Sequence, residues 1–147
     1  MTAKNKDNLF YVCSLIEHIG RTTNNRRGAV VDALGENGVR KMLKDAEVNH
    51  CLSFDQVGEE VTAWYGIVPG DFNPAAGSTF SIPTVQDIGR LYSIIVEACA
   101  EEGKEDAELI KVFKSPVSDL ISNFKSDLYY QNPSYLEESY KAGHLLD

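Results

Sequence analysis

The segment NLFYVCSLIEHIG, residues 8–20, constrains the fold more than any other part of the chain. Apolar residues recur in it at the three- and four-residue spacing of a helix, and further apolar residues fill the positions between them. The first set is Leu9, Val12, Cys13, Ile16 and Ile19, and the second is Phe10, Tyr11 and Leu15. A helix with so little polar surface has to be covered by other elements on most sides. We therefore expect a helix over about 7–21, capped by Asp7 or Asn8, at the centre of a helical core.

A capping pair marks the start of another helix. In SFDQ, Ser53 is followed three residues later by Gln56, which is the spacing of a capping box. Val57, Val61 and Trp64 then recur at helical spacing. The pattern predicts a helix from Ser53 to about residue 65, with these three side chains on its buried face.

Similar signals predict helices at about 24–34, 36–49, 84–102, 105–114, 116–127 and 132–143. Thr84 and Asp87 mark the start of the longest of these. Residues 66–83 break the pattern and contain three of the five prolines, which predicts a long loop with room for a short strand at TFSI, residues 79–82. We therefore predict an all-α fold, a single compact domain over 1–147 with six to eight helices.

Charge is distributed unevenly along the 147 residues, whose formal net charge is −8. Residues 1–50 carry eight Lys/Arg and six Asp/Glu, a balance of +2, and residues 51–147 carry six Lys/Arg and sixteen Asp/Glu, a balance of −10. Phosphate affinity is mainly electrostatic, so an acidic chain is a poor candidate for nonspecific nucleic-acid binding. The basic N-terminal third still leaves room for a local patch.

The cysteines and the N-terminus bear on the compartment. Three cysteines, an odd number, do not suggest a disulfide framework and fit a reducing compartment. The first residues, MTAKNKDN, are polar, and the apolar run behind them is too short for a signal peptide or a membrane span. We expect a cytoplasmic protein that does not enter a membrane.

No pattern typical of a metal site or a catalytic site stands out. The pair His50–Cys51 lacks the spacing of zinc ligands. Cys13 and Cys99 lie on apolar helix faces, which favours a packing role. Adjacent acids, which occur in several pairs, point about 100° apart on a helix and do not converge. We therefore expect no metal and no cofactor, and we favour a protein that is not an enzyme.

The stretch TTNNRRG, residues 22–28, raises a question about charge. A helix that begins within this stretch places Arg26 and Arg27 at its positive end, at a cost of about 0.3–1 kcal/mol each. No acid stands at the spacing that would pair with them locally. We expect each to meet an acid, either of this protein or of a partner. Arg21, Arg26 and Arg27 are therefore the candidate binding residues of the basic segment 21–44.

Aromatic residues crowd into the C-terminal part of the chain. Tyr129, Tyr130, Tyr135 and Tyr140 fall within twelve residues. Tyrosine suits an interface that is wet on one side, and it also suits the attachment of a last helix to a domain. Both interpretations stay open, and Tyr129, Tyr130 and Tyr135 are candidate binding residues under the first of them.

Four segments resemble a small family of bacterial cytosolic proteins without an assigned activity: LFYVCSLIEHIGRTTNNRRGAVVDALG, DAEVNHCLSFDQV, SIPTVQDIGRLY and YYQNPSYLEESYKAG. The resemblance spans nearly the whole chain. It implies a gene in a toxin–antitoxin or mobile-element neighbourhood, and hence an antitoxin, an immunity protein or a regulator. It implies no catalytic residue and no binding residue.

Three hypotheses about function follow. The first is a non-enzymatic interaction module that binds another protein, such as a basic nucleic-acid-handling toxin, through an acidic surface; the chain could also form a homodimer. The second is a nucleic-acid-associated regulator that uses the basic residues of 21–44, with Arg21, Arg26, Arg27 and Lys41 as contacts. The third is a small-molecule enzyme whose site lies between the 66–83 loop and these arginines.

Overall fold

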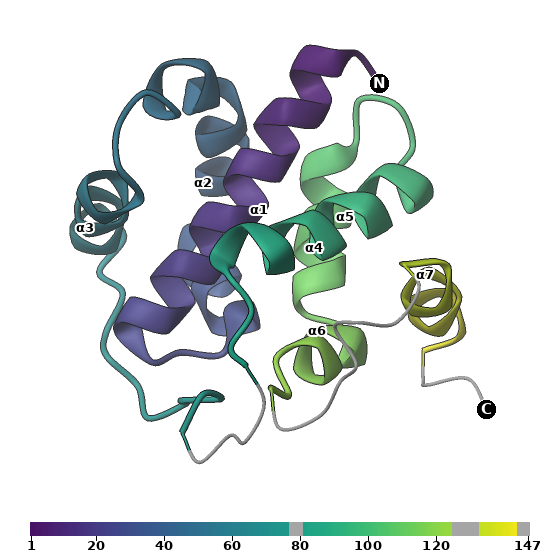
Figure 1. Cartoon of the computed structure of the whole chain (residues 1–147). Helices are drawn as coiled ribbons and strands as arrows, with labels where there is room; N and C mark the ends of the chain where they lie inside the picture. Colours follow the sequence, from purple (N-terminus) through teal and green to yellow (C-terminus); the bar gives the residue numbers. More distant parts are fainter. Residues whose placement is uncertain (77–80, 125–132, 144–147) are drawn as a thin grey trace.

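The computed structural model describes residues 1–76, 81–124 and 133–143, and these form seven α-helices and no strand (Figure 1). The helices are α1 (Ala3–Thr23), α2 (Arg27–Asn49), α3 (Phe54–Trp64), α4 (Val85–Cys99), α5 (Glu105–Phe113), α6 (Pro116–Ile121) and α7 (Pro133–Ala142). The all-α fold expected from the sequence is confirmed.

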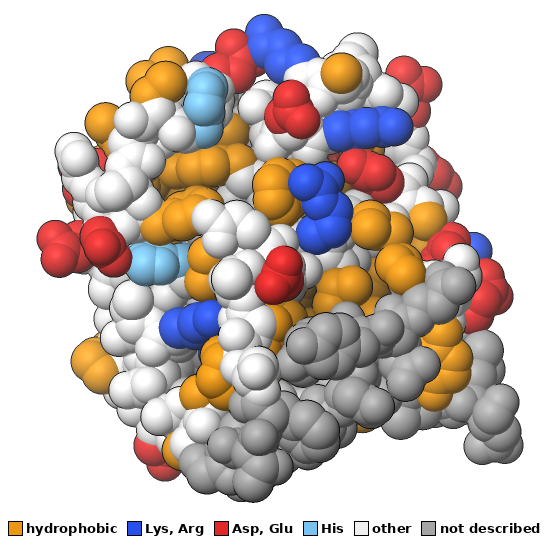
Figure 2. Space-filling model, viewed as in Figure 1, with side chains coloured by type: hydrophobic (Ala, Val, Ile, Leu, Met, Phe, Trp, Pro, Cys, Tyr) orange, Lys and Arg blue, Asp and Glu red, His pale blue; other side chains and the backbone are white. Residues whose placement is uncertain are grey.

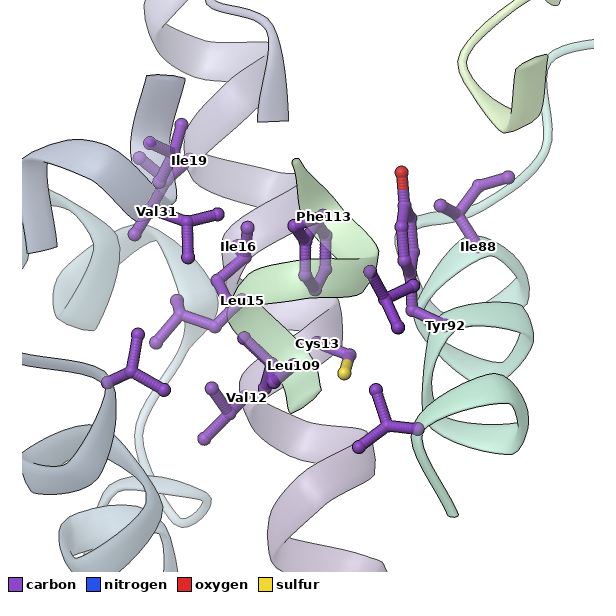
Figure 3. Packing of buried hydrophobic residues seen from close by; sticks show 14 of the residues in the cluster. Val12, Cys13, Leu15, Ile16, Ile19, Val31, Ile88, Tyr92, Leu109 and Phe113 are labelled. Atoms are coloured by element: carbon purple, nitrogen blue, oxygen red, sulfur yellow. The ribbon is translucent and has the colours of Figure 1, made fainter. Parts of the chain in front are cut away.

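Helix α1 runs through the middle of the molecule, and it contacts α2, α3 and α4 (Figure 1). Its side chains from Val12 to Glu17 are all buried, which confirms the central position expected from its apolar pattern. In the close view, side chains of α1 meet those of α2, α4 and α5 (Figure 3). The Tyr92 ring of α4 stacks on the Phe113 ring of α5, with 3.8 Å between their centroids.

Helices α1 and α4 pack tightly against each other at Gly89 and Ser14. A β-carbon added to Gly89 would lie 2.1 Å from Ser14 Oγ and 2.8 Å from Ser14 Cα. Any side chain at position 89 would therefore overlap Ser14. Because Cα belongs to the backbone, rotation of the serine side chain would not remove the overlap. The crossing of the two core helices therefore requires a glycine at position 89.

The two helices expected at 24–34 and 36–49 are the two arms of α2, which breaks at Gly35. This residue has φ 68° and ψ 176°, outside the helical region. A positive φ is accessible to glycine at little cost and is costly for other residues. Gly35 therefore ends the first arm of α2, and the second arm begins immediately after it.

Several helix ends differ from the expected ones. Helix α1 starts at Ala3, because Thr2 caps it by accepting a hydrogen bond from the Asn5 amide. Its polar first turn carries no apolar periodicity, so the cap expected at Asp7 or Asn8 was wrong. Helix α4 ends at Cys99, where the next residue is extended, and α6 ends at Ile121.

Trp64 was expected on the buried face of α3, and this prediction was wrong, because 65% of its surface is exposed. It is the last residue of α3. Tyr65, the next residue, makes the contact with α2 instead: a β-carbon added to Gly38 would lie 3.0 Å from the Tyr65 ring. The helical spacing predicted the buried positions Val57 and Val61 correctly, but it extended the buried face too far, to Trp64.

The loop expected at about 66–83 is present in its described parts. Residues 66–76 and 81–84 form turns and extended chain without a strand. Thr79 and Phe80, half of the short strand allowed for at TFSI, lie outside the described residues.

Candidate functional site

Glu17 is the acid that pairs with Arg27. It lies on the buried face of α1, and its side chain and that of Arg27 are 0% exposed. Arg27 donates from Nε to Glu17 Oε1 at 2.9 Å and from Nη2 to Oε2 at 2.8 Å. Arg21, four residues after Glu17, donates to Oε2 at 2.8 Å. The bidentate geometry gives the carboxylate fixed partners in the interior.

Space for the Arg27 side chain comes from Gly20. A β-carbon on Gly20 would lie 2.5 Å from Arg27 Cδ, so a larger residue would displace the chain that carries the guanidinium. The remaining terminal nitrogen, Nη1, donates to the backbone oxygen of Asn25 at 2.9 Å. Sequence reasoning missed Glu17. The available signal was an acid within the apolar run of residues 8–20, since a buried carboxylate needs a charged or hydrogen-bonding partner.

Arg26 lies at the surface, immediately before α2, and pairs with an acid far along the chain. Its Nη1 is 3.0 Å from Asp119 Oδ1 on α6. Its guanidinium carbon also lies 4.5 Å from the centre of the Phe72 ring, within the range of a cation–π contact. In the rest of the basic segment, Arg40 pairs with Glu36 and Asp106, and Lys41 pairs with Asp45. Each arginine of 21–44 therefore has an acidic partner within this protein.

The stretch TTNN anchors the loop that follows α3. Asn24 adopts a left-handed conformation with φ 55° and ends α1. The amide of Gly70 donates to Thr23 O and the amide of Phe72 to Asn24 O, both at 2.8 Å. The side chain of Asn25 donates to Val68 O at 2.9 Å. These asparagines therefore form the turn between α1 and α2 and hold residues 68–72.

Two of the candidate tyrosines, Tyr129 and Tyr130, lie outside the described residues. Tyr135 is half-buried and packs against the core. Tyr140 does so as well, and its hydroxyl donates to the carboxylate of Glu108 on α5. In the described part of α7, the tyrosines therefore contribute to the attachment of this helix.

Within the described residues, no group of His, Cys, Asp or Glu side chains is arranged to hold a metal ion. Cys13, Cys51 and Cys99 are free thiols. Burial raises the pKa of the Cys13 thiol, so this residue is a core side chain and a poor nucleophile. A membrane-crossing helix would need a longer apolar stretch than any described helix has.

The most distinctive surface lies along α3 and the start of the loop. Asp55, Glu59, Ala63 and Val68 line a groove there, and Trp64 is exposed at the end of α3; we call these five residues the α3 surface. Trp64 and Val68 are 65% and 75% exposed. Figure 2 shows acidic side chains gathered over α3. A groove of about 710 Å³ runs beside it, between α1, α3 and the loop, and the described residues that line it include two acids and no Lys or Arg.

The sequence around α3 keeps this surface free of cations. Residues 45–89 contain seven Asp or Glu and no Lys or Arg. Asp55 Oδ1 lies 3.3 Å from His18 Nε2. The surface thus combines an exposed indole with acids from a stretch that has no Lys or Arg, whereas the arginines of 21–44 pair with acids within the protein.

His18 sits under the α3 surface and responds to pH. Its ring stacks on Phe54, with 5.7 Å between centroids. Burial lowers the pKa of His18 from 6.5, an effect that Asp55 opposes and Arg21 reinforces. The unfolded chain therefore binds this proton more tightly than the folded one. As the pH falls below about 6.5, protonation of His18 in the unfolded chain lowers the free energy of unfolding.

His18→Gln is expected to reduce this loss between pH 7 and pH 5, because the variant has no proton to bind at this position. Urea unfolding at pH 7, 6 and 5, followed by circular dichroism, measures it. His50→Gln, at an exposed histidine, is the matched control. An unchanged dependence in His18→Gln would show that burial of His18 does not set it.

No protein-family model matches the chain, and no match was found among curated proteins or solved structures. The resemblance stated above therefore stays a prediction.

Proposed function

We propose that this chain is a non-enzymatic protein-interaction module that binds a basic partner protein through the α3 surface. The observation that carries the proposal is the exposed Trp64 at the end of a helix whose groove is lined by two acids and, among the described residues, by no Lys or Arg. Tryptophan is strongly enriched among the residues that dominate binding energy at protein interfaces. A tryptophan side chain has only two rotatable bonds, so it loses little conformational entropy when it is covered.

Charge supports a basic partner. A surface with one sign of charge steers an oppositely charged protein towards it and repels proteins of like charge. A nucleic-acid-binding protein presents Lys and Arg on the face that contacts phosphates, and the α3 surface would compete for that face. This is the mode of action expected of an antitoxin, an immunity protein or a regulator. The free cysteines fit action in the cytoplasm.

The other two hypotheses have less support. Arg21 and Arg27 hold an internal carboxylate, and Arg26 and Lys41 pair with acids at the surface, so a nucleic acid would have to replace these partners. The groove beside the loop contains no arginine among the described residues of its lining. An enzyme site between that loop and the arginines therefore gains no support.

Selection from a library of helical peptides tests the proposal without knowledge of the partner. Peptides that combine an apolar stripe with Lys or Arg are expected to be enriched on the immobilised protein. Trp64→Ala is expected to weaken their binding about 30-fold or more, since such anchors are worth about 2 kcal/mol or more. Glu59→Lys is expected to slow association by charge repulsion. Surface plasmon resonance gives both values.

Glu102→Lys is the matched control, because it makes the same charge change at an exposed position between α4 and α5. It is expected to keep most of the affinity. Enrichment of acidic peptides would contradict the proposal, as would peptides that bind Trp64→Ala and the wild-type protein equally well.

A further inference from the structure

A second groove lies on the other side of Phe54, between α1, the end of α2 and the starts of α3 and α4. Its volume is about 800 Å³, which is within the range of small-molecule sites. Phe10, Tyr11, Leu52 and Phe54 provide its apolar lining, and we call it the aromatic groove. Hydrophobic side chains are visible in a hollow over this part of the molecule (Figure 2).

The rings of the aromatic groove are held in place by contacts within the protein. The rings of Tyr11 and Phe54 stack with 5.5 Å between centroids and an interplanar angle of 23°. The Tyr11 hydroxyl donates to Asn49 O at 3.2 Å. A ligand that packs against this part of the groove would meet a surface that is already ordered, which reduces the entropy lost on binding.

Charges at the groove favour a cation. Lys4 pairs with Glu47 at 2.6 Å, so these two lining charges cancel. Asp7 is exposed and lines the groove, and no cation among the described residues pairs with it. It lies three and four residues before Phe10 and Tyr11, on the same side of α1. A carboxylate therefore stands beside aromatic rings, and both attract an ammonium group.

Phe10, an aromatic residue of the groove, also contacts a cation within the protein. On another side of the Phe10 ring, Arg90 places its guanidinium carbon 3.9 Å from the ring centre. The ring therefore already serves as a contact for one cation of the protein.

We infer that the aromatic groove binds a small aromatic amine, a planar ring that carries a protonated primary amine on a short chain. The ring packs against the apolar lining of the groove, which includes Tyr11 and Leu52, and the ammonium pairs with the Asp7 carboxylate. Aromatic acids of the same size lack the required charge, and alkyl amines lack the ring. This site is separate from the α3 surface and does not depend on the function proposed for it.

Three commercial probes test this assignment by isothermal titration calorimetry with the whole chain. Tryptamine is expected to bind with a saturable isotherm in the millimolar range or tighter. Indole-3-acetate, which has the same ring and the opposite charge, and hexylamine, which has the charge without the ring, are expected to bind at least tenfold more weakly.

Asp7→Asn is expected to weaken tryptamine binding about tenfold, because it removes the charge and keeps the shape. Asp71→Asn, the same change at an exposed position of the loop that follows α3, is the control and is expected to leave the affinity unchanged. Both positions are exposed, so both variants should fold. Absence of saturable tryptamine binding, equal binding of indole-3-acetate, or full affinity in Asp7→Asn would each overturn the assignment.

Discussion

Glu17→Leu is expected to lower the free energy of unfolding by about 3–5 kcal/mol. The substitution leaves Arg27 fully buried with no carboxylate to pair with. Removal of one partner from a buried ion pair is costly because the other charge remains desolvated. For a domain whose total stability is about 5–15 kcal/mol, this is a large fraction. Urea unfolding followed by circular dichroism measures it.

A double variant separates the pair from the packing. Glu17→Leu with Arg27→Met replaces both charges by apolar groups, and it is expected to cost less than Glu17→Leu alone. Arg26→Ala breaks only an exposed ion pair with Asp119 and is expected to cost about 1 kcal/mol or less. If Glu17→Leu lowered the free energy of unfolding as little as Arg26→Ala, the buried pair of Glu17 and Arg27 would not stabilise the contact between α1 and the start of α2.

Gly89→Ala is expected to lower the free energy of unfolding by about 3 kcal/mol. In an exposed helix the same change would stabilise the protein by about 1 kcal/mol, because alanine is the better helix former. Here the added methyl group would meet Ser14 Oγ at 2.1 Å and the Ser14 backbone nitrogen at 2.8 Å. Rotation of the serine side chain cannot relieve the second contact, so α1 and α4 must separate.

Gln86→Ala, one turn earlier in α4 and exposed, is the control and is expected to change stability by about 0.5 kcal/mol or less. Thermal unfolding of the two variants under identical conditions makes the comparison. A Gly89→Ala protein as stable as the wild type would indicate that the two helices are not in contact at this point.

The helices were largely predictable because their signals are local. The apolar pattern of α1 is contained in one segment, and the caps Ser53 and Thr84 act on amides three residues away. The ends were less predictable where no apolar residue marks the first turn, as at Thr2. The Gly89 crossing could not be predicted, since nothing near it in sequence shows that Ser14 lies against it.

The candidate site was harder to predict because it depends on tertiary partners. The sequence indicated that Arg27 needed an acid, but Glu17 lies ten residues away across the turn that ends α1. Trp64 was assigned to the core by its spacing, and the structure places it at the surface, where it becomes the main element of the proposed interface. In both cases the missing information was which part of each helix is covered by a neighbour.

The most direct test of the proposed function is an amide chemical-shift titration. The ligand is a designed amphipathic helix with leucines at i, i+3, i+4 and i+7 and lysines elsewhere, and a peptide of the same composition in scrambled order is the control. The account predicts saturable shifts at residues 55–68, including the Trp64 indole, with the ordered peptide and much smaller ones with the scrambled peptide. Equal shifts with both peptides, or shifts confined to residues 21–44, would contradict it.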